Sequence, residues 1–255
     1  KEIMAISVDR VYQKVLAIAN KEQRGYITPQ EFNLFADQAQ MAIFEQYFYD
    51  LEQRQRGTGN SFDYADIVSN IEEKISIFEI HDSSLGGGDA MGDVSLPNLG
   101  GSMWRLGTVK AKYSDPSVIG SSADINTYFE AEQIQQKELN LYMSSYFTSR
   151  FGGPYYTRSV KSSIPSIRVF PIPVDVQISF IKKPATPSWT YVIGNGLNAL
   201  YDSNNPGLQD FQLHDSEENK LVTKILQFAG VTLKDPMLIQ AAAQEETKNI
   251  QQEKQ

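Results

Sequence analysis

The segment from residue 20 to residue 31 has the spacing closest to a metal-binding loop. Side chains with oxygen atoms occupy its first, third, ninth and twelfth positions, and Gly25 occupies the sixth, as in the calcium loop of an EF-hand. Arg24 stands at the fifth position, where an oxygen ligand is expected, and its guanidinium would repel a cation. Thr28 and Glu31 have the spacing of a capping box, which begins a helix without any metal. We therefore expect a capped helical hairpin, with calcium binding as a minor alternative.

Other residue types that carry chemistry are few or poorly grouped. The chain has no cysteine, which excludes disulfides and thiolate metal sites. Neither His81 nor His214 is accompanied by the nucleophile motif of a serine hydrolase. Three carboxylate pairs stand in helix-like segments where charged solvent faces are expected: Glu72 with Glu73, Glu130 with Glu132, and Glu217 with Glu218. We predict that the protein is not an enzyme and uses no metal or cofactor.

The extended segment before Trp189 is more typical of contact between subunits. Two prolines stiffen it, and it ends in a large aromatic side chain. Such a segment can lie across a neighbouring subunit, and tryptophan is enriched among residues that dominate binding energy. The polar stretch from residue 244 to the end holds one apolar residue, Ile250, so it cannot bury a face in its own core. We predict four interface residues: Trp189, Pro184, Pro187 and Ile250.

Composition and charge narrow the classes of partner. The 255-residue chain has a net charge of -8, which argues against a broad nucleic-acid footprint, because such a footprint needs clustered Lys and Arg. Modest basic clusters at Lys110/Lys112 and around Arg168 allow passive contact with DNA, or are the solvated face of a sheet. No apolar run reaches the roughly 18 residues of a membrane span, and no export signal opens the chain. We expect a soluble protein that is not exported and has no membrane partner.

Apolar residues at helical spacing predict the N-terminal elements. A first helix is expected over residues 8–22, and a second from the Thr28 cap to just before Gly57. Residues 62–80 predict a short helix that becomes a strand near its end. Glycine and small polar residues over 83–102 then predict a flexible loop or projecting arm.

From Met103 onward the pattern changes to the alternation that is typical of strands. A helix is expected to interrupt it at about residues 125–147. The clearest strand runs over residues 171–180 and should begin at a sheet edge, because its first prolines cannot donate hydrogen bonds. Residues 167–170 are expected to be its continuation or its hairpin partner.

The order of elements predicts an α+β protein. It comprises an N-terminal helical hairpin, a central and mostly antiparallel sheet with an inserted helix, and C-terminal helices. A helix from Asp215 should stop at Gly230, and another should open at Pro236. We predict one domain with appendages in four segments: 1–82, the N-terminal helical region; 83–102, the glycine-rich arm; 103–213, the β-rich core; and 214–255, the C-terminal helices and polar tail.

Several stretches resemble structural proteins of marine and crAss-like podophages. The opening block from Val11 to Phe48 (VYQKVLAIANKEQRGYITPQEFNLFADQAQMAIFEQYF) resembles their N-terminal helical region. Three later blocks are similar to further parts of the same group: IRVFPIP, ISFIKKPATPSWTY and FQLHDSEENKLVTKILQFAGV, which begin at Ile167, Ile178 and Phe211. The glycine-rich segment has no counterpart in this resemblance.

The resemblance implies a head–tail connector, or neck ring, of a tailed phage. Proteins of this kind form rings, usually of about twelve copies, that dock on the portal protein and meet tail or nozzle proteins. We therefore expect a structural virion protein at the head–tail junction, assembled in the host cytoplasm and lining the DNA passage. The alternatives are a tail-tube or collar component and, less favoured, a virion-associated hydrolase.

The polar tail generates a first prediction. Deleting residues 241–255 should leave the melting temperature unchanged but impair ring formation or docking, because the tail cannot be stabilised by its own core. Thermal melting and native mass measured side by side check both halves. Unchanged assembly of the truncated chain would contradict a role for the tail.

Overall fold

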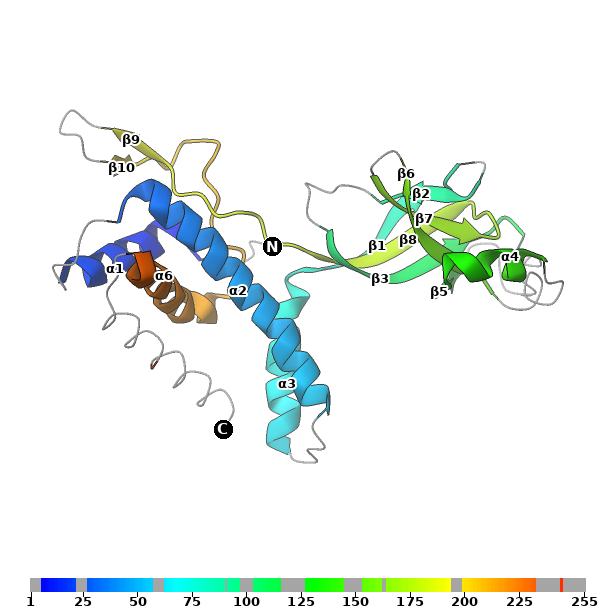
Figure 1. Cartoon of the computed structure of the whole chain (residues 1–255), viewed down its shortest axis with the longest axis horizontal. Helices are drawn as coiled ribbons and strands as arrows, with labels where there is room; N and C mark the ends of the chain where they lie inside the picture. Colours follow the sequence, from blue (N-terminus) through cyan, green and yellow to red (C-terminus); the bar gives the residue numbers. More distant parts are fainter. Residues whose placement is uncertain are drawn as a thin grey trace. The chain divides into compact units, whose positions relative to one another are not determined.

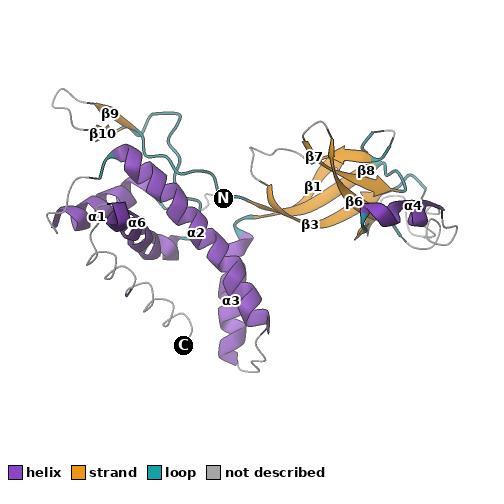
Figure 2. Cartoon of the chain, in the orientation of Figure 1, coloured by secondary structure: helices purple, strands orange, loops and turns teal. Residues whose placement is uncertain are grey.

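The chain folds into two units, one built from both of its ends and one from its middle. The computed structural model describes residues 6–21, 27–56, 62–89, 91–96, 103–115, 127–144, 153–161, 164–193, 199–232 and 244. The helical unit comprises Lys1–Ile77 with Pro184–Gln255, and the sheet unit comprises Phe78–Lys183 (Figure 1). This grouping cuts across the linear segments expected from the sequence, because residues far apart in the chain pack together. The predicted α+β class is confirmed (Figure 2).

The helical unit is built on helices that share a buried face. Its elements are α1 (Val8–Lys21), α2 (Pro29–Arg56), α3 (Phe62–Ser76), the short 3-10 helix η2 (Asp215–Glu217), α6 (Glu218–Thr232) and the strands β9 (Tyr191–Ile193) and β10 (Ala199–Tyr201). The core side chains recur at helical spacing, as expected: Val8, Val11 and Val15 from α1; Phe32, Phe35, Ala39 and Ile43 from α2; Leu221, Val222, Ile225 and Ala229 from α6. Burying such stripes against one another holds the helices together.

The expected start of the second helix is confirmed, and the expected stop of the helix near the C-terminus is wrong. Thr28 N–H donates to Glu31 Oε2 at 3.0 Å, and Glu31 N–H donates to Thr28 Oγ1 at 3.3 Å, which is a capping box. The helix that this box begins ends at Arg56, just before Gly57. However, α6 continues through Gly230 to Thr232, where buried side chains on the preceding turns keep it helical.

The sheet unit contains two four-stranded sheets, ordered β1-β8-β3-β4 and β2-β7-β6-β5. In the described part of this unit the strands are β1 (Glu79–Gly86), β2 (Asp93–Ser95), β3 (Met103–Lys112), β4 (Tyr128–Glu130), β5 (Glu132–Gln133), β6 (Tyr155–Lys161), β7 (Ile164–Phe170) and β8 (Asp175–Lys182), and they are joined by the helix α4 (Gln136–Ser144). All pairs are antiparallel except β5 with β6. Both sheets contribute to one core, with Ile167 and Val169 from one and Ile178 and Phe180 from the other.

The strand expected over residues 171–180 is shorter than predicted, and its expected partner is wrong. β8 begins at Asp175 and pairs with β1 and β3, whereas β7, which ends at Phe170, pairs with β6 and β2 in the other sheet. The chain therefore changes sheets over residues 171–174. Prolines suit that crossing because they have no N–H to contribute to a ladder.

The helix expected at about 125–147 is also only partly right. α4 covers Gln136–Ser144, while Tyr128–Glu130 forms β4, which pairs with β3. The N–H of Ala131 donates to the Val109 carbonyl at 2.8 Å, which extends this contact between the two strands. Pairing with a distant strand thus overrides the local helical pattern. Residues 125–126 and 145–147 lie outside the described part.

The glycine-rich arm is largely ordered in the structure, which corrects the expectation of a flexible loop. Residues 83–86 belong to β1 and residues 93–95 form β2, whereas 97–102 lie outside the described residues. A Cβ on Gly87 would stand 2.3 Å from the Val174 carbonyl oxygen, so the glycine permits close backbone contact rather than motion. Asp89 closes the turn, because its Oδ1 accepts hydrogen bonds from the N–H groups of Met91 and Asp93.

Within the described residues, no helix is long and apolar enough to cross a membrane. The second C-terminal helix expected from Pro236 and the polar tail fall outside the described residues, apart from Gln244.

Asp89 generates a pH prediction. Its hydrogen bond from Lys161, and then those from Met91 and Asp93, lower the pKa of Asp89 to about 2. Because the folded pKa is depressed, its stabilising effect is complete above the unfolded pKa and is lost as pH falls through the folded pKa, from about 4 to about 2. The melting temperature of the Asp89→Asn variant should therefore fall less over this pH interval than that of the wild type, because asparagine does not titrate.

Thermal melting of the full chain between pH 5 and pH 2 measures this difference. Glu132→Gln removes an exposed carboxylate from the same unit and serves as the control that should behave as wild type. Identical pH profiles for wild type and Asp89→Asn would contradict the role of this carboxylate.

Candidate functional site

Trp189 is a core residue of the helical unit and not the exposed anchor that the sequence predicted. Its side chain is 2% exposed, and its ring centroid lies 4.4 Å from that of Tyr12 on α1. Its Nε1–H donates to Asp9 Oδ1 at 2.9 Å, and its backbone N–H donates to Asn33 Oδ1 at 2.8 Å. A large aromatic ring with its polar atom satisfied inside the chain cannot contact a neighbour.

The segment before Trp189 lies along α2 of its own chain. Pro184 and Pro187 are both buried, which corrects their assignment as interface residues. The fully buried Gln40 holds the segment, because its Nε2 donates to the Ala185 carbonyl at 2.8 Å and its Oε1 accepts from Gln212 N–H at 3.0 Å. The fourth candidate, Ile250, lies outside the described residues.

Directly after Trp189, the chain forms a hairpin that exposes apolar side chains. β9 and β10 pair with each other, and Figure 1 shows them projecting from the helices of their unit. Val192 is 56% exposed, Ile193 65% and Leu200 60%. Exposed apolar side chains that cluster in this way are typical of an interaction surface, whereas single exposed apolar residues are common on any protein.

The hairpin has a supported face and a free face. The rings of Tyr191 and Tyr201 stack with Trp189 at centroid distances of 5.7 Å and 5.9 Å. Because side chains alternate along a strand, the directly paired Val192 and Leu200 point to the opposite face. The buried tryptophan therefore makes the base of the hairpin rigid while the opposite face stays open.

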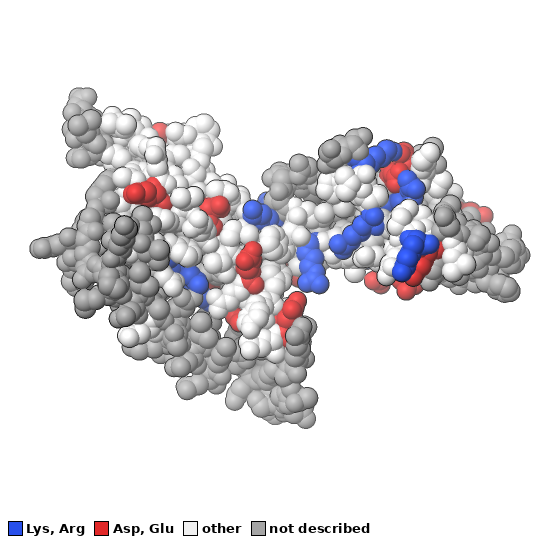
Figure 3. Space-filling view, in the orientation of Figure 1, with Lys and Arg blue, Asp and Glu red and all other residues white. Residues whose placement is uncertain are grey.

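The hairpin is also nearly uncharged. No charged residue stands between Lys183 and Asp202. Figure 3 shows the β9–β10 projection almost without charged side chains, whereas Asp and Glu are visible on other parts of the helical unit. Burial, and then the charges of Asp210, Asp9 and Asp202, raise the pKa of Tyr201, so its hydroxyl stays neutral. The surface is thus apolar and aromatic, as the centre of a protein interface is.

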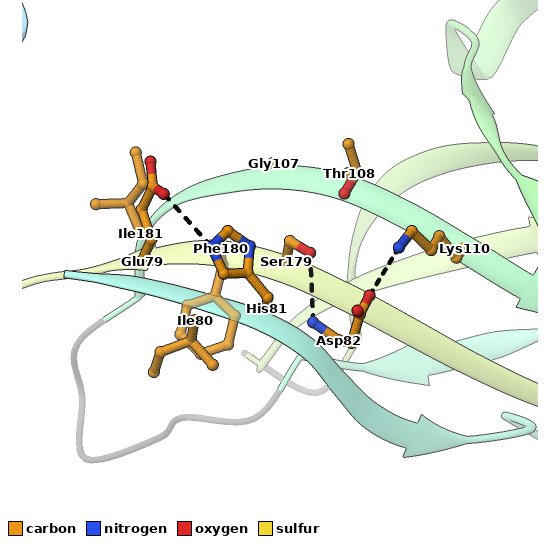
Figure 4. A pocket seen from close by; sticks show the side chains of 10 residues that line it. All are labelled: Glu79, Ile80, His81, Asp82, Gly107, Thr108, Lys110, Ser179, Phe180 and Ile181. Carbon is orange, nitrogen blue, oxygen red and sulfur yellow. Dashed lines mark hydrogen bonds and ion pairs between the residues drawn. The ribbon is translucent and has the colours of Figure 1, made fainter. Parts of the chain in front are cut away.

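The sheet unit offers a second candidate, a groove of about 480 Å³ shown in Figure 4. It lies where β1 and β3 both bulge opposite Ser179 of β8. His81 and Asp82 bulge on one side, and Gly107 and Thr108 on the other. Two bulges facing the same residue bend the sheet strongly at this point.

The polar groups of the groove pair with one another. Asp82 N–H donates to Ser179 Oγ at 3.4 Å, and Lys110 Nζ lies 2.8 Å from Asp82 Oδ1. His81 Nε2 lies 3.5 Å from Glu79 Oε2 instead of serving as a base for the Ser179 hydroxyl. The arrangement stabilises the bulges and places no nucleophile beside a base.

The other residues considered in the sequence form a helix cap and buried ion pairs. His214 caps η2, with its ring accepting from Ser216 N–H. Glu217 and Glu218 are buried and not on a solvent face, because Glu217 pairs with Lys74 and Glu218 with Arg10 and Lys14. Burial would raise the pKa of Glu218, but the hydrogen bonds from Lys14 and Arg10 outweigh it and lower the pKa.

The basic clusters already have partners. Arg168 forms two hydrogen bonds with Asp93, both at 2.8 Å, and Lys161 pairs with Asp89. Lys112 Nζ lies 5.8 Å from the centre of the Tyr128 ring. Residues 22–26 of the EF-hand-like loop lie outside the described part, and the described residues hold no cluster of three or more acidic or histidine side chains able to bind a metal.

The hairpin residues were missed by the sequence analysis, although a signal for them exists. Gly194-Asn195-Gly196 predicts a turn, and apolar residues flank it on both sides, which together are typical of a hairpin. The described strands have only three residues each, too few for the alternation of a strand to stand out in the sequence.

No family model matches the chain, and no curated protein is similar to it.

The contrast between the buried base and the exposed hairpin generates a prediction. Trp189→Ala should lower the free energy of unfolding by about 3–5 kcal/mol, because it removes a buried aromatic side chain. Val192→Ala, which truncates an exposed side chain, should change it by less than about 0.5 kcal/mol. Chemical denaturation of the full chain measures both, and equal effects would contradict the assignment of base and free face.

Proposed function

We propose that the chain is a structural subunit of a tailed-phage particle that assembles into a ring in the head–tail connector. The β9–β10 hairpin carries this proposal, because it holds exposed apolar side chains on a rigid base. The blocks that resemble podophage structural proteins supply the place in the particle. The exposed apolar side chains of the hairpin favour assembly, because contact with a neighbour would remove them from water.

Burial of the hairpin on a neighbour would remove its apolar groups from water. Each exposed Val, Ile or Leu contributes on the order of 1 kcal/mol or more when buried in a contact. Repetition around a ring multiplies this contribution without any further type of contact. Because its base is packed on Trp189, the hairpin loses little conformational entropy there when it docks.

The proposal gives DNA only passive contact. Lys110, Lys112, Lys161 and Arg168 already interact with acidic or aromatic neighbours, so they offer a weak electrostatic track. Weak contact suits a passage through which DNA must move. The portal protein and the tail or nozzle proteins are the partners above and below the ring.

Native mass tests the proposal. The wild type should form a ring, alone or when mixed with the portal protein of its phage, and the double variant Val192→Lys with Leu200→Lys should stay monomeric. Two lysines on a formerly apolar face would keep it hydrated and repel their counterparts. Val160→Lys changes a side chain that is 73% exposed in the sheet unit and should assemble as wild type. A wild type that stays monomeric with the portal present would overturn the proposal.

A further inference from the structure

The hairpin has backbone groups that point away from its own ladder. Asp202 N–H donates to the Thr190 carbonyl at 3.0 Å, so these two residues form a hydrogen-bonded pair. The ladder continues from there with Tyr201 opposite Tyr191, Leu200 opposite Val192 and Ala199 opposite Ile193. Hydrogen-bonded and non-hydrogen-bonded pairs alternate in an antiparallel ladder. Leu200 and Val192 therefore bond to each other, and the pairs on either side of them do not.

The N–H and C=O groups of those other pairs consequently point outward. On β9 they belong to Tyr191 and Ile193, and on β10 they belong to Ala199 and Tyr201. Among the described residues, each of these strands pairs only with the other. The hairpin thus has two edges, and an exposed edge of this kind is a template for another strand.

A comparison with another edge strand of the same chain shows that the hairpin edges lack protection. β1 has two irregularities in its pairing, a positive φ at Asp82 and a charged residue at Glu79. Bulges and charges of this type prevent edges from pairing with other chains. The hairpin has neither device, because no charged residue and no proline stands between Pro187 and Asp202.

We propose that the β9 edge of one copy pairs with the β10 edge of the next, so that successive hairpins form one continuous antiparallel sheet around the ring. This inference rests on the ring assembly proposed above. Copies related by rotation about a ring axis keep the same strand direction. Because β9 and β10 run antiparallel within a copy, β10 of one copy meets β9 of the next antiparallel without any rearrangement.

A second copy fits these edges better than a foreign strand. The chain carries a net charge of -8, so two copies repel each other unless they meet through an uncharged surface, and the hairpin is such a surface. Head-to-tail pairing also brings Val192 and Leu200 of neighbouring copies onto one face of the shared sheet. A closed ring leaves no edge unpaired, whereas a two-fold dimer would leave one edge open on each copy.

Proline substitution separates edge pairing from side-chain contact. Ala199 is the first residue of β10, where proline is tolerated, and its N–H points outward. Ala199→Pro should therefore keep the hairpin but raise the concentration needed for assembly by about tenfold or more, since one interface hydrogen bond is lost at every contact. Thr186→Pro lies in an exposed position before the hairpin and is the matched control that should assemble as wild type.

Residue-resolved hydrogen exchange provides a second measurement that needs no variant. In the monomer, the amides of Val192 and Leu200 should exchange slowly and those of Ile193 and Tyr201 fast. In the assembled wild type, all four should exchange slowly. This pattern would identify the outward amides as the ones that gain partners.

The outcomes distinguish this inference from the proposed function. If the wild type assembles while the amides of Ile193 and Tyr201 still exchange fast, edge pairing is overturned and the ring is held by other contacts. The same holds if Ala199→Pro assembles at wild-type concentration. If the wild type does not assemble even with the portal protein, both proposals fail. If these amides exchange slowly only when the portal protein is bound, and the copies do not contact one another, the portal protein covers the edge. That result overturns the proposal that a second copy pairs with it.

Discussion

The packing of Trp189 against Tyr12, with the two rings tilted, is the contact on which the helical unit depends. It joins a segment from the last third of the chain to the first helix, and the hydrogen bonds with Asp9 and Asn33 fix its orientation. Other contacts join the same two parts of the chain, because Ile6 pairs with Phe211 and Gln40 bonds to both Ala185 and Gln212. The buried pairs of Glu217 with Lys74 and of Glu218 with Lys14 add a second set of connections between the same segments.

The sheet unit is closed by a contact of its own. Lys182 N–H donates to the Phe78 carbonyl at 2.8 Å, so the strands that enter and leave this unit lie side by side. Insertion at such a point disturbs the host unit little, because both connections leave it close together. Each unit can therefore keep its own core while the chain runs from one to the other and back.

The β9–β10 hairpin shows how stability and assembly can use neighbouring residues differently. Trp189 is buried and contributes to the free energy of folding, whereas Val192 and Leu200 are exposed and contribute little until a partner covers them. The strand edges differ in a similar way, because bulges and charge protect the edge of β1 from pairing, whereas the edges of the hairpin have no such protection. An apolar, unprotected edge would promote aggregation unless it is meant to pair.

Short-range signals were enough to predict several elements of this protein. The Thr28–Glu31 capping box, the end of α2 before Gly57 and the buried stripe of α6 all depend on residues within a few positions of one another. The Gly194-Asn195-Gly196 sequence, which predicts a turn, is a signal of the same kind. In each case the deciding interactions lie within one or two turns of chain, so the sequence itself contains both partners.

Tertiary structure decided the features whose partners lie far away in the sequence. Pairing with β3 made a strand of Tyr128–Glu130, close approach to Val174 and Val169 ordered the glycine-rich segment, and two separate sheets divided residues 164–182. Trp189 was expected at a surface because its segment is extended and stiffened by prolines, features that an interface and a buried strap share. Only the positions of Tyr12, Asp9 and Asn33, more than a hundred residues earlier in the chain, determine that it is buried and that the exposed surface begins with Val192.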